Sequence, residues 1–163
     1  VSTDDYSAGI CATEVLRECL SADARFAVLA GPADDLRSCR RVEGFLSCLP
    51  HAAVISAGSW YCEDAAGVAG DVMALAPQGV FCVNDRLAEA MLRHCAKAGL
   101  KPPLLVGHDN APVAEEWNLT TIGTPWEEMV ATALAIIRLR LEGYTGSAQH
   151  ILIAQRPVRR LTA

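Results

Sequence analysis

The chain has 163 residues, of which 52% are hydrophobic and 20% are charged, and this balance is typical of a single globular domain. Its apolar runs are all shorter than the roughly 20 residues that a membrane-spanning helix needs. The formal net charge of −5 argues against a surface that grips nucleic acid, because phosphate binding requires a basic face.

In chain order, the first element expected is a helix that starts at Asp4 or Asp5 and carries an apolar face as far as Leu20. Asp34 is placed to cap a second helix, which ends near Pro50. Short apolar runs bounded by turn residues indicate strands. Strands are predicted at residues 25–30, 52–55, 79–83, 104–106 and 119–122, a terminal strand region at 151–153 and 157–158, and further helices at 63–75, 85–99 and 125–141.

The stretch from Gly79 to Arg86 is the most informative of these, since an apolar run ends on Asn84-Asp85 where helical spacing begins. An uninterrupted apolar run suits a strand that is buried on both faces. Asp85 is expected to cap the helix that follows. Strands and helices alternate almost throughout, so we predict an α/β fold with a doubly wound, mostly parallel sheet flanked by helices.

The seven cysteines are scattered along the chain, and no two of them form a C-x-x-C pair. This spacing predicts reduced thiols in a cytoplasmic protein, and it gives no sign of a metal site or a cofactor. The first residue is Val1 rather than methionine, so we expect the sequence to be part of a longer protein.

Four residues are expected near one edge of the predicted sheet. Trp60, Asn84 and Asp109 each follow the carboxyl end of a different strand, and Arg41 lies on the helix after the first strand. The carboxyl ends of parallel strands meet at one edge, where open α/β sheets bind ligands. Arg and Asp can hold neighbouring hydroxyl groups, Asn both donates and accepts, and an indole stacks on a ring face. The set predicts a binding site for a small polyhydroxylated or heteroaromatic ligand, without a nucleophile beside a base.

Each of these residues also has a purely structural interpretation. Trp60 could belong to the core or to an interface, and Arg41 could pair with a surface acid such as Glu43 or Asp35. Asp109 could merely hold a turn, because Asx turns favour Asp and Asn. Their expected position at one shared edge is what favours the binding interpretation.

Six segments, in the same order along the chain, resemble the effector-sensing region of the lactose-repressor and galactose-repressor family. They look like the family's opening strand and helix, its Arg-x-x-Gly-aromatic signature, its strand ending in Asn-Asp, its Gly-x-Asp turn, its Leu-Thr-Thr segment and its usual close. The segments are Val1 to Asp5 with Gly9, Arg41-Val-Glu-Gly-Phe45, Gly79 to Asp85, Gly107-His-Asp-Asn110, Leu119-Thr-Thr-Ile122 with Pro125 and Met129, and Val158 to Thr162.

The resemblance implies a periplasmic-binding-protein-like fold, in which two lobes close around an effector and an upstream helix-turn-helix binds operator DNA. It implies effector contacts at Arg41, Trp60, Asn84 and Asp109. It also implies a homodimeric, cytoplasmic transcription regulator whose effector is a sugar, with a purine or a sugar phosphate as alternatives. Residues 1–163 would form one sensing-domain fragment without the DNA-binding domain, in which residues 1–20 and 124–143 border or belong to the other lobe.

Two other functions are compatible with the pattern. The first is a sugar-binding protein of a transport system with the same fold, which an export signal upstream would distinguish. The second is a doubly wound enzyme that uses Asp34 and Asp35 for metal-assisted phosphoryl transfer. This second alternative lacks an acid on the strand end itself and a paired lysine.

Overall fold

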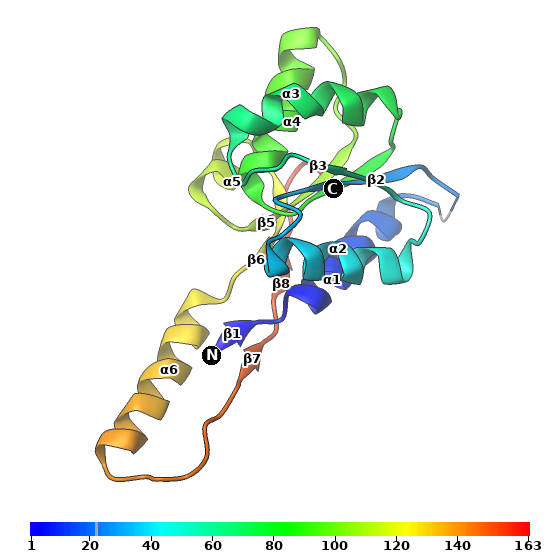
Figure 1. The fold of residues 1–163 in the computed structure, drawn as a ribbon. Helices are drawn as coiled ribbons and strands as arrows, with labels where there is room; N and C mark the ends of the chain where they lie inside the picture. The colour runs from blue at the N-terminus through cyan, green and yellow to red at the C-terminus, as the bar shows by residue number, and fades with distance from the viewer. Residues whose placement is uncertain (22) are drawn as a thin grey trace.

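Six strands form the main sheet, and every pair except the last is parallel (Figure 1). The computed structural model describes residues 1–21 and 23–163. The strand order is β3-β2-β4-β5-β6-β8, in which β8 pairs antiparallel with β6. The strands are β2 (Phe26–Ala30), β3 (Ala53–Ser56), β4 (Gly79–Cys82), β5 (Leu104–Asp109), β6 (Thr120–Gly123) and β8 (Arg156–Val158). The predicted α/β fold with a mostly parallel sheet is confirmed.

Helices cover both faces of this sheet (Figure 1). On one face α1 (Asp5–Cys19) packs against α2 (Leu36–Cys48), and on the other α3 (Cys62–Ala74) packs against α4 (Asp85–Ala98). A short helix, α5 (Pro112–Glu116), lies in a segment for which the sequence pattern predicts only a loop. The connection from β2 to β3 therefore runs over one face of the sheet, and those from β3 to β4 and from β4 to β5 run over the other, as in a doubly wound sheet.

The core depends on strands that are buried from both sides. All residues of β2 and of β4 are buried, as their uninterrupted apolar runs predict. Phe45 of α2 and Phe81 of β4 stack with their ring centroids 5.5 Å apart, and this contact attaches the helix layer to the middle of the sheet. The edge strand β3 instead alternates half-buried and exposed residues.

The helices α1 and α2 approach so closely that two positions admit only glycine. A Cβ atom on Gly9 would overlap the backbone oxygen of Arg41, and a Cβ atom on Gly44 would overlap that of Tyr6. Both obstacles are backbone atoms, which cannot swing aside as a side chain can. The close contact makes α1 part of the same packed body as the sheet.

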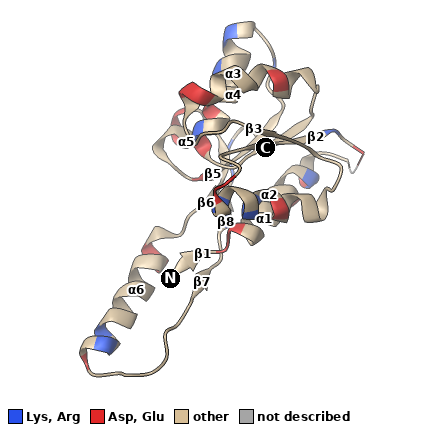
Figure 2. Ribbon diagram, viewed as in Figure 1, with Lys and Arg blue, Asp and Glu red and all other residues tan. Residues whose placement is uncertain are grey.

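A smaller part of the chain extends away from this body (Figure 1). It contains α6 (Trp126–Leu141) and a two-stranded parallel sheet of β1 (Ser2–Thr3) and β7 (Leu152–Ile153). No residue of α6 is buried, and Figure 2 shows its charged residues near its two ends. None of the helices in the described part of the chain is both long and apolar enough to cross a membrane.

The predicted cap of α2 is wrong, whereas the two predicted terminal strands are present as β7 and β8. Asp35 rather than Asp34 caps α2, because its carboxylate accepts hydrogen bonds from the backbone N–H groups of Arg37 at 2.8 Å and Ser38 at 3.3 Å. The terminal strand region is divided, since β7 pairs with β1 in the small sheet while β8 joins the main sheet. Local sequence cannot show this division, because both strands depend on partners far away in the chain.

We predict opposite effects on stability for two glycine-to-alanine substitutions. Gly44→Ala should lower the free energy of unfolding by about 1–3 kcal/mol or more, because the added methyl group meets the backbone of α1. Gly67→Ala, at an exposed position of α3 with open space around it, should raise that free energy by up to about 1 kcal/mol. Urea unfolding of both variants is the measurement, and equal shifts would contradict the close contact of α1 with α2.

Candidate binding site at the carboxyl edge of the sheet

Arg41 is the central polar residue at this edge. It projects from α2 and is only 6% exposed. Its Nε donates to Oδ1 of Asp5 at 2.7 Å, and its Nη1 donates to the backbone oxygen of Val83 at 2.7 Å. These bonds join α1, α2 and the end of β4. Within residues 1–21 and 23–163, no hydrogen bond engages Nη2 of Arg41, so this nitrogen remains available as a donor.

Trp60 lies beside Arg41 in the loop between β3 and α3. The guanidinium carbon of Arg41 is 5.8 Å from the centroid of the indole ring, and that of Arg37 is 5.7 Å away. The indole also packs against Gly31, where any side chain would come within 3.0 Å of the ring. Its Nε1 donates to Oδ2 of Asp35 at 3.3 Å. Trp60 is thus held in place by contacts from two loops and α2.

Asn84 uses its side chain within the protein. Its Oδ1 accepts a hydrogen bond from the backbone N–H of Leu87 at 2.8 Å, and its Nδ2 donates to the backbone oxygen of Trp60 at 3.0 Å. Asn84, and not Asp85, is therefore the N-cap of α4, which corrects the prediction for Asp85. The second proton on Nδ2 is the group of this amide that a ligand could still engage.

Asp85 instead bridges elements behind the edge. Its Oδ2 accepts from the backbone N–H of Ala111 at 2.7 Å, and its Oδ1 accepts from Oγ1 of Thr121 at 2.6 Å. Gly107 leaves room for it, because a Cβ atom there would overlap Oδ1. Burial, opposed by these two hydrogen bonds, raises the pKa of Asp85 to about 7.

Asp109 ends β5 and turns towards solvent. Its φ of +110° lies in the left-handed region that non-glycine residues seldom adopt, and its side chain is 41% exposed. One carboxylate oxygen, Oδ1, lies 2.8 Å from Nδ1 of the buried His108. The other, Oδ2, makes no hydrogen bond within the described part of the chain. Asp109 therefore presents an open acceptor at the same edge at which Arg41 presents a donor.

The structure joins Arg41, Trp60 and Asn84 directly, and it connects Asp109 to them less tightly. Arg41 is near enough to His108 for its charge to help lower the pKa of that imidazole, after the larger effect of burial. Neither of the two cavities described below is lined by Arg41, Trp60, Asn84 or Asp109.

Three residues that contact the candidate site residues or their neighbours are not among those that the sequence pattern predicts for the site. Asp5 pairs with Arg41 across 36 positions, for which local sequence gives no signal. His108 lies in the Gly-His-Asp-Asn segment and is fully buried; its place directly after an apolar strand could have indicated this burial. Gln155 contacts His108 from a segment 47 residues away, again without a local signal.

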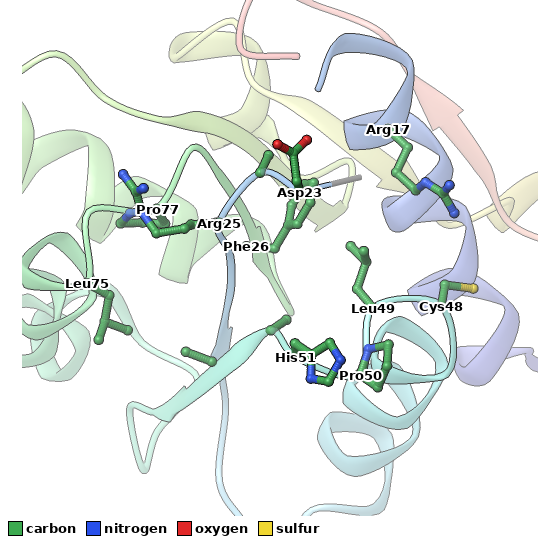
Figure 3. A pocket seen from close by; sticks show the side chains of 13 residues that line it. Arg17, Asp23, Arg25, Phe26, Cys48, Leu49, Pro50, His51, Leu75 and Pro77 are labelled. Atoms are coloured by element: carbon green, nitrogen blue, oxygen red, sulfur yellow. The ribbon is translucent and has the colours of Figure 1, made fainter. Parts of the chain in front are cut away.

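The larger of two described cavities lies at the opposite edge of the sheet (Figure 3). Its volume is about 570 Å³, and Phe26, Leu49 and Leu75 give it an apolar lining with Arg17 and His51 nearby. A smaller cavity of about 260 Å³ lies between α2 and the end of β3. We place the candidate site at the carboxyl edge nonetheless, because buried, hydrogen-bonded polar groups converge there and open α/β sheets bind ligands at that edge.

The enzyme alternative finds no support in the arrangement of Asp34 and Asp35. Asp35 is engaged as the cap of α2 and by Arg37 and Trp60. In residues 1–21 and 23–163, no group of three or more His, Cys, Asp or Glu side chains is placed to hold a metal ion.

Comparison with known proteins identifies the class of this fold. Residues 22–163 match the family described as the periplasmic binding protein-like domain, and the chain belongs to this family. The resemblance to lactose-repressor-type sensing regions, suggested by the six sequence segments, is confirmed by relatives that are transcription regulators.

Three of these relatives illustrate the likeness. The HTH-type transcriptional repressor PurR of Vibrio parahaemolyticus is 30% identical over 129 residues, which are 71% of this chain and 39% of that protein. A LacI family regulator of Enterococcus faecalis with bound ribose has a TM-score of 0.85 at 22% identity, covering 98% of this chain and 61% of that one. The CelR–cellobiose complex has a TM-score of 0.84 at 23% identity, covering 99% and 53%. The chain thus spans less than half the length of the curated relatives it matches.

The raised pKa of Asp85 leads to a prediction about pH. In the folded state this pKa is about 7, above the ordinary 3.8, so the contribution of Asp85 to stability is present below pH 4 and is lost as the pH rises to about 7. Asp85→Asn stays neutral over this range. Between pH 4 and 7 its free energy of unfolding should therefore rise relative to wild type by roughly 2–4 kcal/mol.

Denaturant unfolding at several pH values measures this difference. The control is Asp71→Asn, which changes an exposed acid on α3 and should leave the pH dependence unchanged. Parallel pH profiles for Asp85→Asn and wild type would show that Asp85 titrates normally in the fold.

Proposed function

We propose that this chain is the effector-sensing part of a bacterial transcription regulator, with a binding role rather than a catalytic one. The observation that carries the proposal is the polar cluster at the carboxyl edge of the sheet. There Arg41 and Asp109 each keep one polar atom free of hydrogen bonds to the described residues, while Trp60 and Asn84 hold the surrounding loops. Relatives with matching segments are named as transcriptional repressors or regulators, which supports the same role here.

A small sugar is the effector that we infer. A sugar offers adjacent hydroxyl groups, which can donate to the carboxylate of Asp109 and accept from the guanidinium of Arg41. Bound ribose and bound cellobiose in two proteins of the same fold support this chemistry. A purine or a sugar phosphate would use the same donors and acceptors and is the alternative effector.

A sugar-binding protein of a transport system is the second candidate function, because it would share both the fold and the site chemistry. The regulator names of the curated relatives favour the first candidate. A regulator of this kind would act in the cytoplasm. It would bind operator DNA through a separate helix-turn-helix domain that these 163 residues do not supply.

We also propose that α6 packs against residues outside this chain in the complete sensor. Trp126, Val130, Leu134, Ile137 and Leu141 recur at intervals of three or four and are all more than half exposed. Such spacing places them on one face of the helix. In the proposed two-lobed sensor, residues 124–143 would belong to the second lobe, and the sensor would form a homodimer.

The first test of this function is Asp109→Ala. The variant should bind its effector about 10–100-fold more weakly than wild type, because a charged hydrogen-bond partner is lost. Calorimetric titration with D-ribose, cellobiose and adenine is the measurement, and Asp71→Ala is the control because its carboxylate is exposed on α3. Binding of none of these probes to wild type, or equal binding to wild type and Asp109→Ala, would contradict the proposed site.

A second prediction concerns α6. When residues 1–163 are studied alone, the apolar stripe should be covered by a second copy, since monomers seldom expose large apolar patches. Ile137→Glu should weaken this self-association at least tenfold by placing a charge in the stripe. The matched control is Ala135→Glu, which puts the same charge on the far side of the exposed helix. Light scattering over a dilution series decides it, and a monomer at high concentration would refute the prediction.

A further inference from the structure

His108 occupies the centre of a buried hydrogen-bonded chain that no part of the proposed ligand contact explains. The residue is fully buried at the end of β5. Its Nδ1 lies 2.8 Å from Oδ1 of Asp109, and its Nε2 lies 2.7 Å from Nε2 of Gln155. The amide of Gln155 lies in addition 3.3 Å from Oγ1 of Thr124. The chain therefore runs from an exposed carboxylate, through an imidazole, to an amide that is itself buried.

With His108 neutral, the donors and acceptors in this hydrogen-bonded chain admit one consistent arrangement. The carboxylate of Asp109 can only accept, so Nδ1 of His108 must carry a proton. In the neutral imidazole Nε2 is then an acceptor, and Gln155 must turn its NH₂ group towards it. The opposite amide orientation would set Oε1 of Gln155 against a lone pair. The orientation found leaves Oε1 buried and without a partner in the described part of the chain.

The neutral form of His108 follows from its surroundings. Burial lowers its pKa, and the nearby charge of Arg41 lowers it further, whereas the bonds to Asp109 and Gln155 oppose this shift. Asp109 and Arg41 are the charged groups that act on the imidazole. An uncharged imidazole leaves the negative charge of Asp109 undiminished at its exposed oxygen, Oδ2.

Gln155 lies where the polypeptide passes from the smaller part, which contains α6, β1 and β7, back to the main sheet. It separates β7, in the small sheet, from β8, in the main sheet. Thr124 lies at the second crossing, between β6 and α6, and its backbone N–H donates to the backbone oxygen of Asp109 at 3.4 Å. The buried hydrogen-bonded chain thus contacts both segments that connect the main body with the smaller part after Asp109, at Thr124 and at Gln155.

We propose that His108 and Gln155 are positioning residues that couple the carboxylate of Asp109 to the two crossing segments. Gln155 itself belongs to one of these segments, and its amide contacts Thr124 in the other. His108 fixes Asp109 as a pure acceptor, so the effector must offer a donor, a hydroxyl or N–H group, at this position. Movement of either crossing segment shifts Gln155 or Thr124. Through His108, this shift changes the direction in which the carboxylate of Asp109 faces a ligand. This proposal rests on the proposed function for its effector, but its hydrogen-bonded chain can be tested without one.

The first test is spectroscopic and uses the unmodified 163-residue chain. Nitrogen-15 NMR of the histidine rings at pH 7 should show His108 as the neutral tautomer with the proton on Nδ1, and it should stay neutral well below pH 6.5. In Gln155→Glu, a carboxylate accepts at Nε2, so His108 should become an imidazolium that persists above pH 7. A proton on Nε2 in wild type, or free titration near pH 6.5, would overturn the proposal.

The second test is a double-mutant cycle between the two ends of the chain. Asp109→Ala and Gln155→Met should be coupled, so that their combined effect on the unfolding equilibrium constant departs at least about threefold from the product of the single effects. In a His108→Phe background, where the ring remains but both ring nitrogens are lost, this departure should disappear. Coupling of equal size in both backgrounds, or in neither, would refute a connection through His108.

A third measurement separates this proposal from the proposed function. D-ribose and cellobiose serve as probes, and Gln155→Met should weaken whichever binds by roughly 3–10-fold, whereas Gln149→Met, an exposed control, should not. Unchanged affinity in Gln155→Met would overturn the coupling to the ligand site. If neither probe binds wild type, the proposed sugar fails, while the NMR signature and the double-mutant cycle still decide the role of His108.

Discussion

The candidate site depends on the buried ion pair between Arg41 and Asp5. A guanidinium that is removed from water is tolerated only if its charge and its N–H groups are satisfied. Asp5 and the backbone oxygen of Val83 satisfy two of them, and both come from segments other than α2. The close approach of α1 to α2 at Gly9 and Gly44 brings Asp5 within reach. Helix packing on one face of the sheet therefore positions the polar group at its edge.

The same arrangement restricts the neighbours of Arg41. Its guanidinium faces the ring of Trp60, and the backbone oxygen of Trp60 in turn receives the amide of Asn84. Since Asn84 also caps α4, the loop after β3 is tied to the start of a core helix. Three of the four candidate site residues thus form one unit that is held together by internal contacts. Preorganisation of this kind lowers the ordering cost of binding.

Sequence periodicity predicted most of the fold because the strands and helices here are specified locally. Residues 26–30 and 79–82 are apolar throughout because both of their faces are covered, and this feature is typical of strands in a parallel-sheet core. The sequence pattern predicts Asp85 instead of Asn84 as the cap of α4, since both residue types cap helices and spacing cannot separate neighbours. The partners of Asp85 at Ala111 and Thr121 come from other strand ends and are invisible locally. For the same reason local sequence gives no sign of Asp5, which bonds Arg41 across 36 positions, or of Gln155, which contacts His108 across 47.

The two neighbouring acids at the strand ends show how packing gives one residue type different chemistry. Asp85 is enclosed against Gly107, and its pKa is raised to about 7. It therefore bridges Ala111 and Thr121 inside the body as a neutral or partly charged group. Asp109 is partly exposed, and it receives its internal hydrogen bond on one oxygen only. The negative charge of Asp85 is disfavoured by burial and by the nearby charge of Asp109. Asp109 therefore presents an acceptor oxygen outwards, at the same edge of the sheet at which Arg41 presents a donor.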